Sequence, residues 1–189
     1  MTNSKILGLV IVIASILVAS PFALQNANAG LGTVCSTDKN NPTTGTHGLV
    51  FIVNTGDDCY IGEKGISTTV NLISLDGGGK VVVVNTTAEE VLIENTSEKI
   101  KFKDNFITDD QVLIRNNNVS HLEIMDNDGT GISIIITSNQ ANILKVVGNS
   151  VDIPMKDNTI DSFAICKNNT PEPHSWAENT YNGKNKGCP

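Results

Sequence analysis

Aromatic and basic side chains are scarce in this sequence. Phe, Trp and Tyr make up 4% of the 189 residues, and Arg115 is the single arginine. This scarcity argues against a long sugar-binding groove lined by stacked rings. Lys and Arg number 13 against 20 Asp and Glu, a net charge of −7. The acidic balance argues against nucleic acid or anionic lipid as a partner, because both require a basic patch, and it permits divalent cations.

The signals of helices, hairpins and nucleophilic catalysis are missing as well. No segment shows a capped 3.6-residue period, so we expect almost no helix. No Asn-Gly step, the usual signal of a tight hairpin, occurs between residues 80 and 169. The histidines His47, His121 and His174 lie in no motif resembling a catalytic triad.

The N-terminus has the order of a secretory signal peptide. Lys5 precedes an apolar run that ends at Leu24, and the small-residue motif Ala27-Asn28-Ala29 follows. We predict cleavage after Ala29 and a secreted or cell-surface protein with no membrane attachment after cleavage. A retained membrane anchor is the alternative, since the run is just long enough to span a bilayer.

One short phrase repeats about every ten residues between residues 80 and 169. It consists of two apolar residues at i and i+2, followed three positions later by Asn or Thr. The phrases begin at Val81, Val91, Ile100, Val112, Leu122, Ile134, Leu144, Ile153 and Phe163. The i, i+2 spacing places both apolar side chains on the same face of a short strand, pointing into a core.

The closing residue of each phrase marks a turn. Asn tolerates the left-handed conformation and can hydrogen-bond its own backbone. The predicted turn asparagines are Asn105, Asn117, Asn127, Asn139, Asn149, Asn158 and Asn168. Because two phrases make a coil of about 20–22 residues, equivalent asparagines should stack on one another in successive coils.

We therefore predict an all-β, right-handed parallel β-helix of about 4–6 short coils. Such short strands without crossover helices cannot form an ordinary parallel sheet, whereas a solenoid pairs each strand with its equivalent one coil later. Residues 1–29 are the signal peptide, 30–62 the N-terminal cap and first coil, 63–168 the coils, and 169–189 the C-terminal cap. An antiparallel sandwich is the competing architecture.

Over residues 49–168, the coil length and turn asparagines resemble the right-handed parallel β-helix (pectin lyase-like) superfamily, which includes pectate lyases, polygalacturonases and many short-repeat surface proteins. This resemblance concerns the architecture and implies no particular chemistry.

Cys35, Cys59, Cys166 and Cys188 are an even number in an exported chain and predict two disulfides. The stacked coils should separate the two caps by roughly 20 Å, and a disulfide holds its Cα atoms within about 7 Å. We predict that Cys35 pairs with Cys59 and Cys166 with Cys188, leaving no thiol nucleophile.

Two sets of residues are weak candidates for chemistry. The segment containing Asp57 and Asp58 is similar to the paired-aspartate segment of polygalacturonases, which would imply acid and base work on a glycosidic bond. The supporting Asn-Thr-Asp, Gly-His-Gly and Arg-Ile-Lys segments of that family are missing, so a capping turn is the simpler interpretation. Lyases usually require a basic residue, and Arg115 could serve beside the Asp104 column.

Carboxylates that stack between coils are candidates for a calcium site. Asp104 and Asp126 should lie one strand spacing apart, with Asp128 nearby, and oxygen ligands of this kind suit calcium. Solvated turn carboxylates are the alternative, and we expect no other cofactor.

Three functions remain open. The first is a non-catalytic extracellular or cell-surface β-helix with a structural, adhesive or scaffold role and a polysaccharide or cell-surface partner. The second is a carbohydrate-active enzyme, either a hydrolase or a calcium-dependent lyase. The third is a calcium-stabilised binding module.

Overall fold

The protein is an all-β parallel solenoid. The computed structural model describes residues 32–130 and 133–189, and over these residues the chain winds through about seven turns with no α-helix. The expected 4–6 coils were therefore slightly too few. The described residues contain no helix long and apolar enough to cross a membrane. The predicted signal peptide lies outside the described residues.

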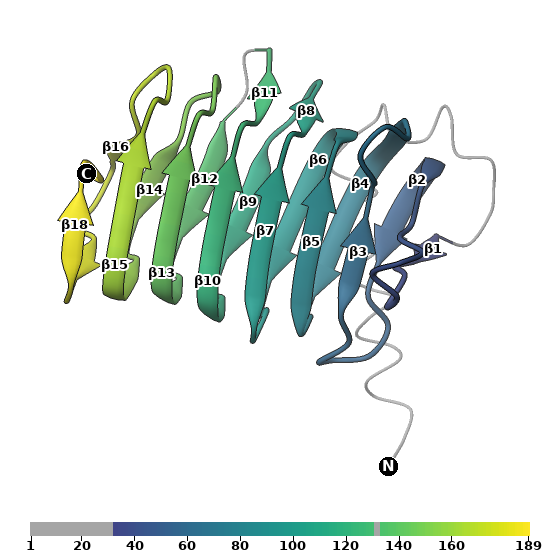
Figure 1. Ribbon diagram of the computed structural model, residues 1–189, viewed down its shortest axis with the longest axis horizontal. Helices are drawn as coiled ribbons and strands as arrows, with labels where there is room; N and C mark the ends of the chain where they lie inside the picture. The colour runs from purple at the N-terminus through teal and green to yellow at the C-terminus, as the bar shows by residue number, and fades with distance from the viewer. Residues whose placement is uncertain (1–31, 131–132) are drawn as a thin grey trace. The chain divides into compact units, whose positions relative to one another are not determined.

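Two parallel sheets form the walls of the solenoid (Figure 1). The first, sheet A, has ten strands: β1 (Thr33–Val34), β2 (Gly45–Phe51), β4 (Thr68–Asp76), β6 (Thr86–Glu94), β8 (Phe106–Ile107), β9 (Val112–Arg115), β11 (Asp128–Gly129), β12 (Ile134–Thr137), β14 (Pro154–Lys156) and β16 (His174–Ser175). The second, sheet B, has eight: β3 (Cys59–Ile61), β5 (Lys80–Val84), β7 (Lys99–Lys103), β10 (Asn118–Met125), β13 (Gln140–Val147), β15 (Thr159–Lys167), β17 (Thr180–Tyr181) and β18 (Lys184–Lys186).

Each strand pairs with its equivalent in the next coil, as the repeat predicts. Ile100 of β7 lies beside Leu122 of β10, and Leu122 lies beside Leu144 of β13. All the strand pairs are parallel, which excludes the antiparallel sandwich. In Figure 1 the sheet B strands in front point upward while the chain advances to the left, which is the sense of a right-handed coil.

The apolar residues of the first eight phrases form the core. Both apolar positions of each of these phrases are almost completely buried, and Phe102 is the largest fully buried side chain. This burial supplies the main stabilising free energy of each coil, because each large apolar side chain removed from water contributes about 2 kcal/mol.

In most turns, the residue with the left-handed conformation is the one immediately before the residue that the sequence predicted. Positive φ angles occur at Asn85, Asn95, Asp104, Asn116, Asp126, Ser138, Gly148, Asp157 and Asn168. Most of these are Asn or Asp, which tolerate this conformation better than other non-glycine residues. The residue that follows each turn, Thr in the first two and Asn in the others, does not adopt the left-handed conformation and is buried instead.

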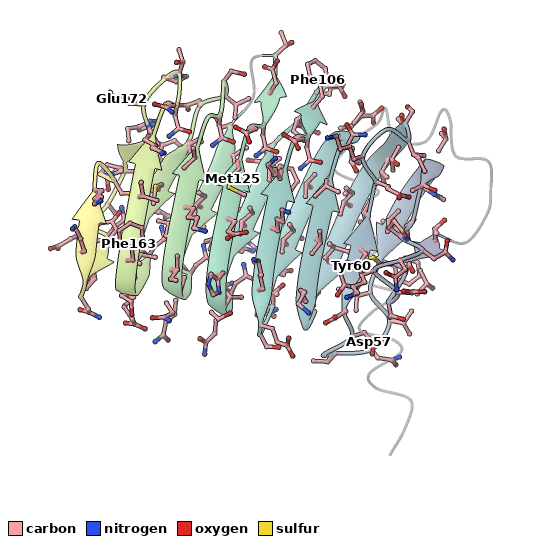
Figure 2. The ribbon with its side chains drawn as sticks, viewed as in Figure 1. Asp57, Tyr60, Phe106, Met125, Phe163 and Glu172 are labelled. Carbon is pink, nitrogen blue, oxygen red and sulfur yellow. A yellow bond between two sulfur atoms is a disulfide. The ribbon has the colours of Figure 1, made fainter. Side chains whose placement is uncertain are left out.

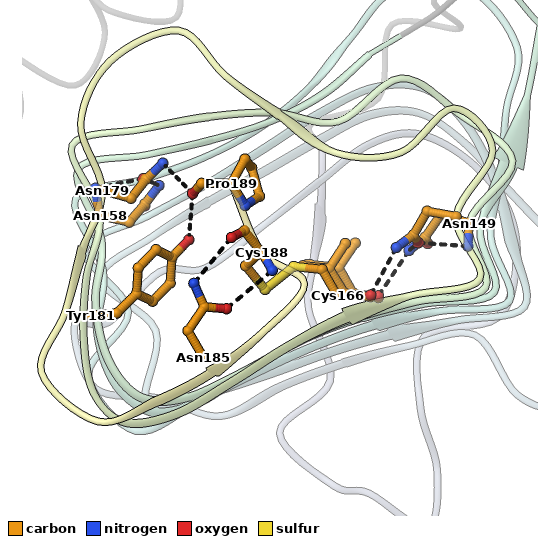
Figure 3. Close-up of a disulfide and its surroundings, with 11 residues drawn as sticks. Asn149, Asn158, Cys166, Asn179, Tyr181, Asn185, Cys188 and Pro189 are labelled. Atoms are coloured by element: carbon orange, nitrogen blue, oxygen red, sulfur yellow. Dashed lines mark hydrogen bonds between the residues drawn. A yellow bond between two sulfur atoms is a disulfide. The ribbon is translucent and has the colours of Figure 1, made fainter.

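These inward asparagines form two ladders that run along the solenoid. The first contains Thr86, Asn105, Asn127, Asn149 and Asn169, and the second contains Thr96, Asn117, Asn139, Asn158 and Asn179. Figure 3 shows Asn149 and Asn158 at opposite ends of the coil cross-section. The predicted stacking of asparagine on asparagine is confirmed for the pairs from Asn105 to Asn149 and from Asn117 to Asn158.

Every rung between two asparagines repeats the same three hydrogen bonds. The backbone N–H and the side-chain Nδ2 of Asn127 both donate to Oδ1 of Asn149, at 3.0 and 2.8 Å. Nδ2 also donates to the carbonyl oxygen of Phe102, at 3.1 Å. Each side chain therefore satisfies backbone groups of its neighbours that the turn leaves without strand partners.

The last phrase was predicted one residue out of register. Ala164 and Cys166 face the core, whereas Phe163 and Ile165 point outward. Consequently Asn168 lies in the exposed turn at φ 55° and Asn169 joins the ladder. A register shift beside Asn142 displaces β15, and inward orientation of Cys166 is required for its disulfide.

Both predicted disulfides are present, one in each cap. Cys35 bonds to Cys59 and Cys166 bonds to Cys188. At the C-terminal end, the hydroxyl of Tyr181 donates to the carbonyl oxygen of Pro189 at 2.9 Å, and the ring packs against the core (Figure 3). Burial raises the pKa of Tyr181 to about 12. Trp176, the other large aromatic residue of this cap, is 59% exposed.

We expect Asn127→Ala to lower the free energy of unfolding by about 2–4 kcal/mol, because it leaves buried groups on Asn105 and Phe102 without partners. Urea denaturation of the oxidised protein measures this change. Asn118→Ala is the matched control: Asn118 is exposed at the start of β10, and its loss should cost less than about 0.5 kcal/mol. Equal destabilisation by both variants would contradict a structural role for the ladder.

Candidate functional site

Lysines line the outer surface of sheet B, which we call the lysine face. Alternate residues of its strands point outward, and their rows continue from coil to coil. The lysines in these rows are Lys80, Lys99, Lys101, Lys103, Lys145, Lys167, Lys184 and Lys186. Two carboxylates point outward from the same strands, Glu123 of β10 and Asp161 of β15. An otherwise acidic chain therefore carries a basic sheet surface.

Glu123 ties two coils of the lysine face together. Its carboxylate is 3.0 Å from the ammonium groups of both Lys99 and Lys145, and its side chain is only 9% exposed. Burial alone would raise the pKa of Glu123, but the hydrogen bonds and positive charges of Lys145 and Lys99 outweigh burial and lower it. Glu123 is therefore ionised at neutral pH and organises the face.

Four other lysines of the face have no carboxylate within ion-pair distance among the described residues. They are Lys101, Lys167, Lys184 and Lys186, of which the last three are exposed. Lys186 lies over the ring of Phe163, with Nζ 5.8 Å from the ring centroid. Figure 2 shows Phe163 and Met125 on this surface. These lysines remain available to an anionic partner.

A shallow pocket continues the face at its N-terminal end. Its volume is about 480 Å³, and its floor contains the outward side chains of Val82 and Val84. Lys39 and Lys64 line it beside Tyr60, and Glu63 contributes a carboxylate. Including Lys39 and Lys64, ten lysines lie on the face or in its pocket.

The rest of the described surface is acidic. Lys156 and Arg115 are its only cations among the described residues, whereas most of the 20 Asp and Glu residues lie there. Burial and the negative charge of Asp110 both raise the pKa of Glu90 on the sheet A side. The net charge of −7 therefore averages over two surfaces of opposite sign.

Asp57 and Asp58, the candidate acid and base, both accept hydrogen bonds from neighbouring residues. Asp58 accepts hydrogen bonds from the Tyr60 hydroxyl at 2.8 Å and from the Lys80 backbone at 2.9 Å. Burial would raise the pKa of Asp58, but these hydrogen bonds and the charge of Lys80 lower it. Asp57 accepts a hydrogen bond from Asn54 at 3.0 Å. A catalytic acid requires a raised pKa, so this geometry favours a role in the cap.

Lys103 supplies the cation that the stacked carboxylates require. Its Nζ is 3.0 Å from Asp104 and 3.6 Å from Asp126, and bridges the two coils. Asp128 accepts hydrogen bonds from the Gly129 backbone and the Ser150 hydroxyl, which lower its pKa. Among the described residues no three acidic, histidine or cysteine side chains gather as a metal-binding group.

Arg115 lies in a different column from the one expected. It is the last residue of β9 in sheet A, beside Glu94 of the preceding coil, and its Nε is 2.8 Å from the Glu94 carboxylate. The expected neighbour, Asp104, lies at the end of a sheet B strand. The structure therefore does not bring Arg115 together with the candidate calcium ligands.

The three histidines lie in separate parts of the structure and do not contact one another. His47 contacts the hydroxyl of Thr33, and His174 contacts Asp152 and packs near Trp176. His121 lies on the lysine face between Lys99 and Ile143.

Comparison with known proteins finds no matching family model, no similar curated protein and no similar solved structure. The fold and the geometry of the site therefore carry the functional argument.

Sequence reasoning missed the lysine face, although the signal was present. The phrases at Val81 and Ile100 have lysine at the outward positions, as Lys80 and as Lys99-x-Lys101-x-Lys103. Because alternate strand residues share a face, reading the outward positions coil by coil would have collected most of the lysines into one surface.

Acid should weaken the Glu123 bridge. The pKa of Glu123 is lower in the folded protein than its ordinary value of 4.5, so its stabilisation is complete above that value and is lost as pH falls through the folded pKa. We expect Glu123→Gln to cost about 1–3 kcal/mol at neutral pH and to reduce the loss of stability on acidification. Urea denaturation across the pH range tests this, with Glu172→Gln, in an exposed loop, as control. If Glu123→Gln loses as much stability on acidification as the wild type, Glu123 does not form the stabilising bridge.

Because Lys103 occupies the position between Asp104 and Asp126, we expect the melting temperature to be the same in millimolar calcium and in chelator. Thermal unfolding followed by circular dichroism measures it. A calcium-dependent rise in Tm that disappears in Asp126→Asn would instead identify a metal site.

Proposed function

We propose that this protein is a secreted or cell-surface β-solenoid with a non-catalytic role as a binding scaffold. The observation that carries the proposal is the separation of charge, with ten lysines gathered along one sheet surface and its pocket and the remaining surface acidic. Such a surface matches an anionic partner over many contacts and has no convergent catalytic group.

The interior of the solenoid supports the scaffold role. Two asparagine ladders and a disulfide in each cap hold the coils in register. Disulfides form and persist in oxidising compartments, which is compatible with an extracellular protein. Membership of the pectin lyase-like superfamily remains part of this proposal, supported by the coil length and the inward asparagines.

The contacts of the candidate catalytic residues also support a non-catalytic role. Asp58 is held by Tyr60 and Lys80, and Arg115 is paired with Glu94 on sheet A. Neither arrangement leaves a carboxyl group with a raised pKa next to a basic residue, which hydrolases and lyases require.

The proposal is tested by incubating the oxidised full-length exported protein with acidic and neutral polysaccharides. We expect no new reducing ends and no unsaturated sugar products. We expect fluorescently labelled protein to bind the surface of the producing cells. Asp58→Asn should lower the melting temperature, because two hydrogen bonds in the cap lose a charged acceptor.

Two outcomes would overturn the proposal. The first is polysaccharide cleavage that disappears in the Asp57→Asn or Asp58→Asn variant while the fold is retained. The second is the absence of labelled protein from the cell surface under conditions in which the folded protein is stable.

A further inference from the structure

We infer that the lysine face and its pocket bind a linear acidic polysaccharide laid along the solenoid axis. This inference rests on the proposed scaffold function and adds the chemical class of the ligand.

The spacing of the lysines suits an extended polymer. Lysines project from β5, β7, β13, β15 and β18, and neighbouring strands of a sheet lie about 4.8 Å apart. This separation is close to the advance of one sugar unit along an extended chain. A polymer that crosses the strands therefore meets lysines on most coils without bending.

The surface between the lysines is apolar and half-buried. Val82 lies beside Lys101, Ile165 lies beside Lys145 on the next strand, and Ile143 precedes Lys145 by two residues on β13. These side chains form a floor on which the C–H faces of sugar rings can pack, while the flexible lysines reach upward. The ammonium group of lysine is a mobile point charge, so it accepts carboxylate or sulfate groups without the fixed geometry of arginine.

The pocket argues for a polymer over a membrane. It is a concave site lined by Lys39, Lys64 and Tyr60 at one end of the face. A flat anionic bilayer cannot enter it, whereas the end of a chain can. The few aromatic side chains on the face argue against single-stranded nucleic acid, whose bases require rings for stacking.

The length of the face limits the effective size of the ligand. Sheet B presents a path of seven strands from β3 to β17, which corresponds to roughly 30 Å. Affinity should therefore rise with oligosaccharide length and stop rising once the chain spans this distance.

The test measures binding of the oxidised full-length protein to polygalacturonate, dextran sulfate and neutral dextran by calorimetry at two salt concentrations. Single-stranded DNA and anionic vesicles are measured in the same way. We expect binding to at least one of the acidic polymers and none to neutral dextran. The carboxylated and sulfated arms identify which anionic group is preferred.

The face variant is Lys101→Gln/Lys167→Gln, because neither lysine has an ion-pair partner among the described residues. We expect it to bind about 10- to 30-fold more weakly at roughly 0.1 M salt, with a shallower salt dependence. The control variant Lys156→Gln/Gln111→Glu makes the same change in net charge away from the face, and its affinity should equal that of the wild type.

Three results would overturn the inference. They are no binding to either acidic polymer, equal weakening of the face and control variants, and tighter binding to single-stranded DNA or anionic vesicles than to either polymer. None of these results concerns catalysis or attachment to cells, so the inference can fail while the scaffold function stands. Conversely, polysaccharide cleavage would overturn the proposed non-catalytic function, whatever the measured affinities for the polymers.

Discussion

From Thr86 onward, the register of the solenoid depends on the hydrogen bonds of its buried asparagines. A coil of about 20 residues must turn sharply at both ends of its flattened cross-section, and each turn leaves backbone groups without strand partners. The side chain of Asn127 or Asn139 supplies these partners by bridging two coils. Because each asparagine side chain in the ladder is both donor and acceptor, the coils that it joins are held in one register and cannot slip independently.

Fixed register converts a local sequence pattern into an extended surface. An outward residue on one strand is stacked directly on the equivalent residue of the next, so Lys80 and Lys99 become neighbours although 19 residues separate them. Like charges stacked in this way repel, and Glu123 offsets part of the repulsion between Lys99 and Lys145. The separation of charge is thus compatible with stability because a few carboxylates lie among the lysines.

Much of the fold could be predicted from the sequence because the i, i+2 apolar spacing and the recurring asparagines are local signals. The prediction failed where a distant constraint decides the local structure. Phe163 is larger and more apolar than Ala164, yet Cys166 must face inward to reach Cys188, and this reverses the whole phrase. The lysine face was not predicted because the net charge was averaged over the whole chain. Arg115 was placed beside Asp104 because the sequence pattern did not show which of the two sheets each strand joins.

The two halves of each coil differ in how freely their length varies. Successive ladder partners lie between 19 and 22 residues apart, yet the bonds between them keep the same geometry. Short extra strands, β8 and β11, occur only in sheet A within the described residues. Insertions and deletions on that side can change its loops while the opposite wall keeps its alignment, so the acidic side of the molecule can diverge without disturbing the basic one.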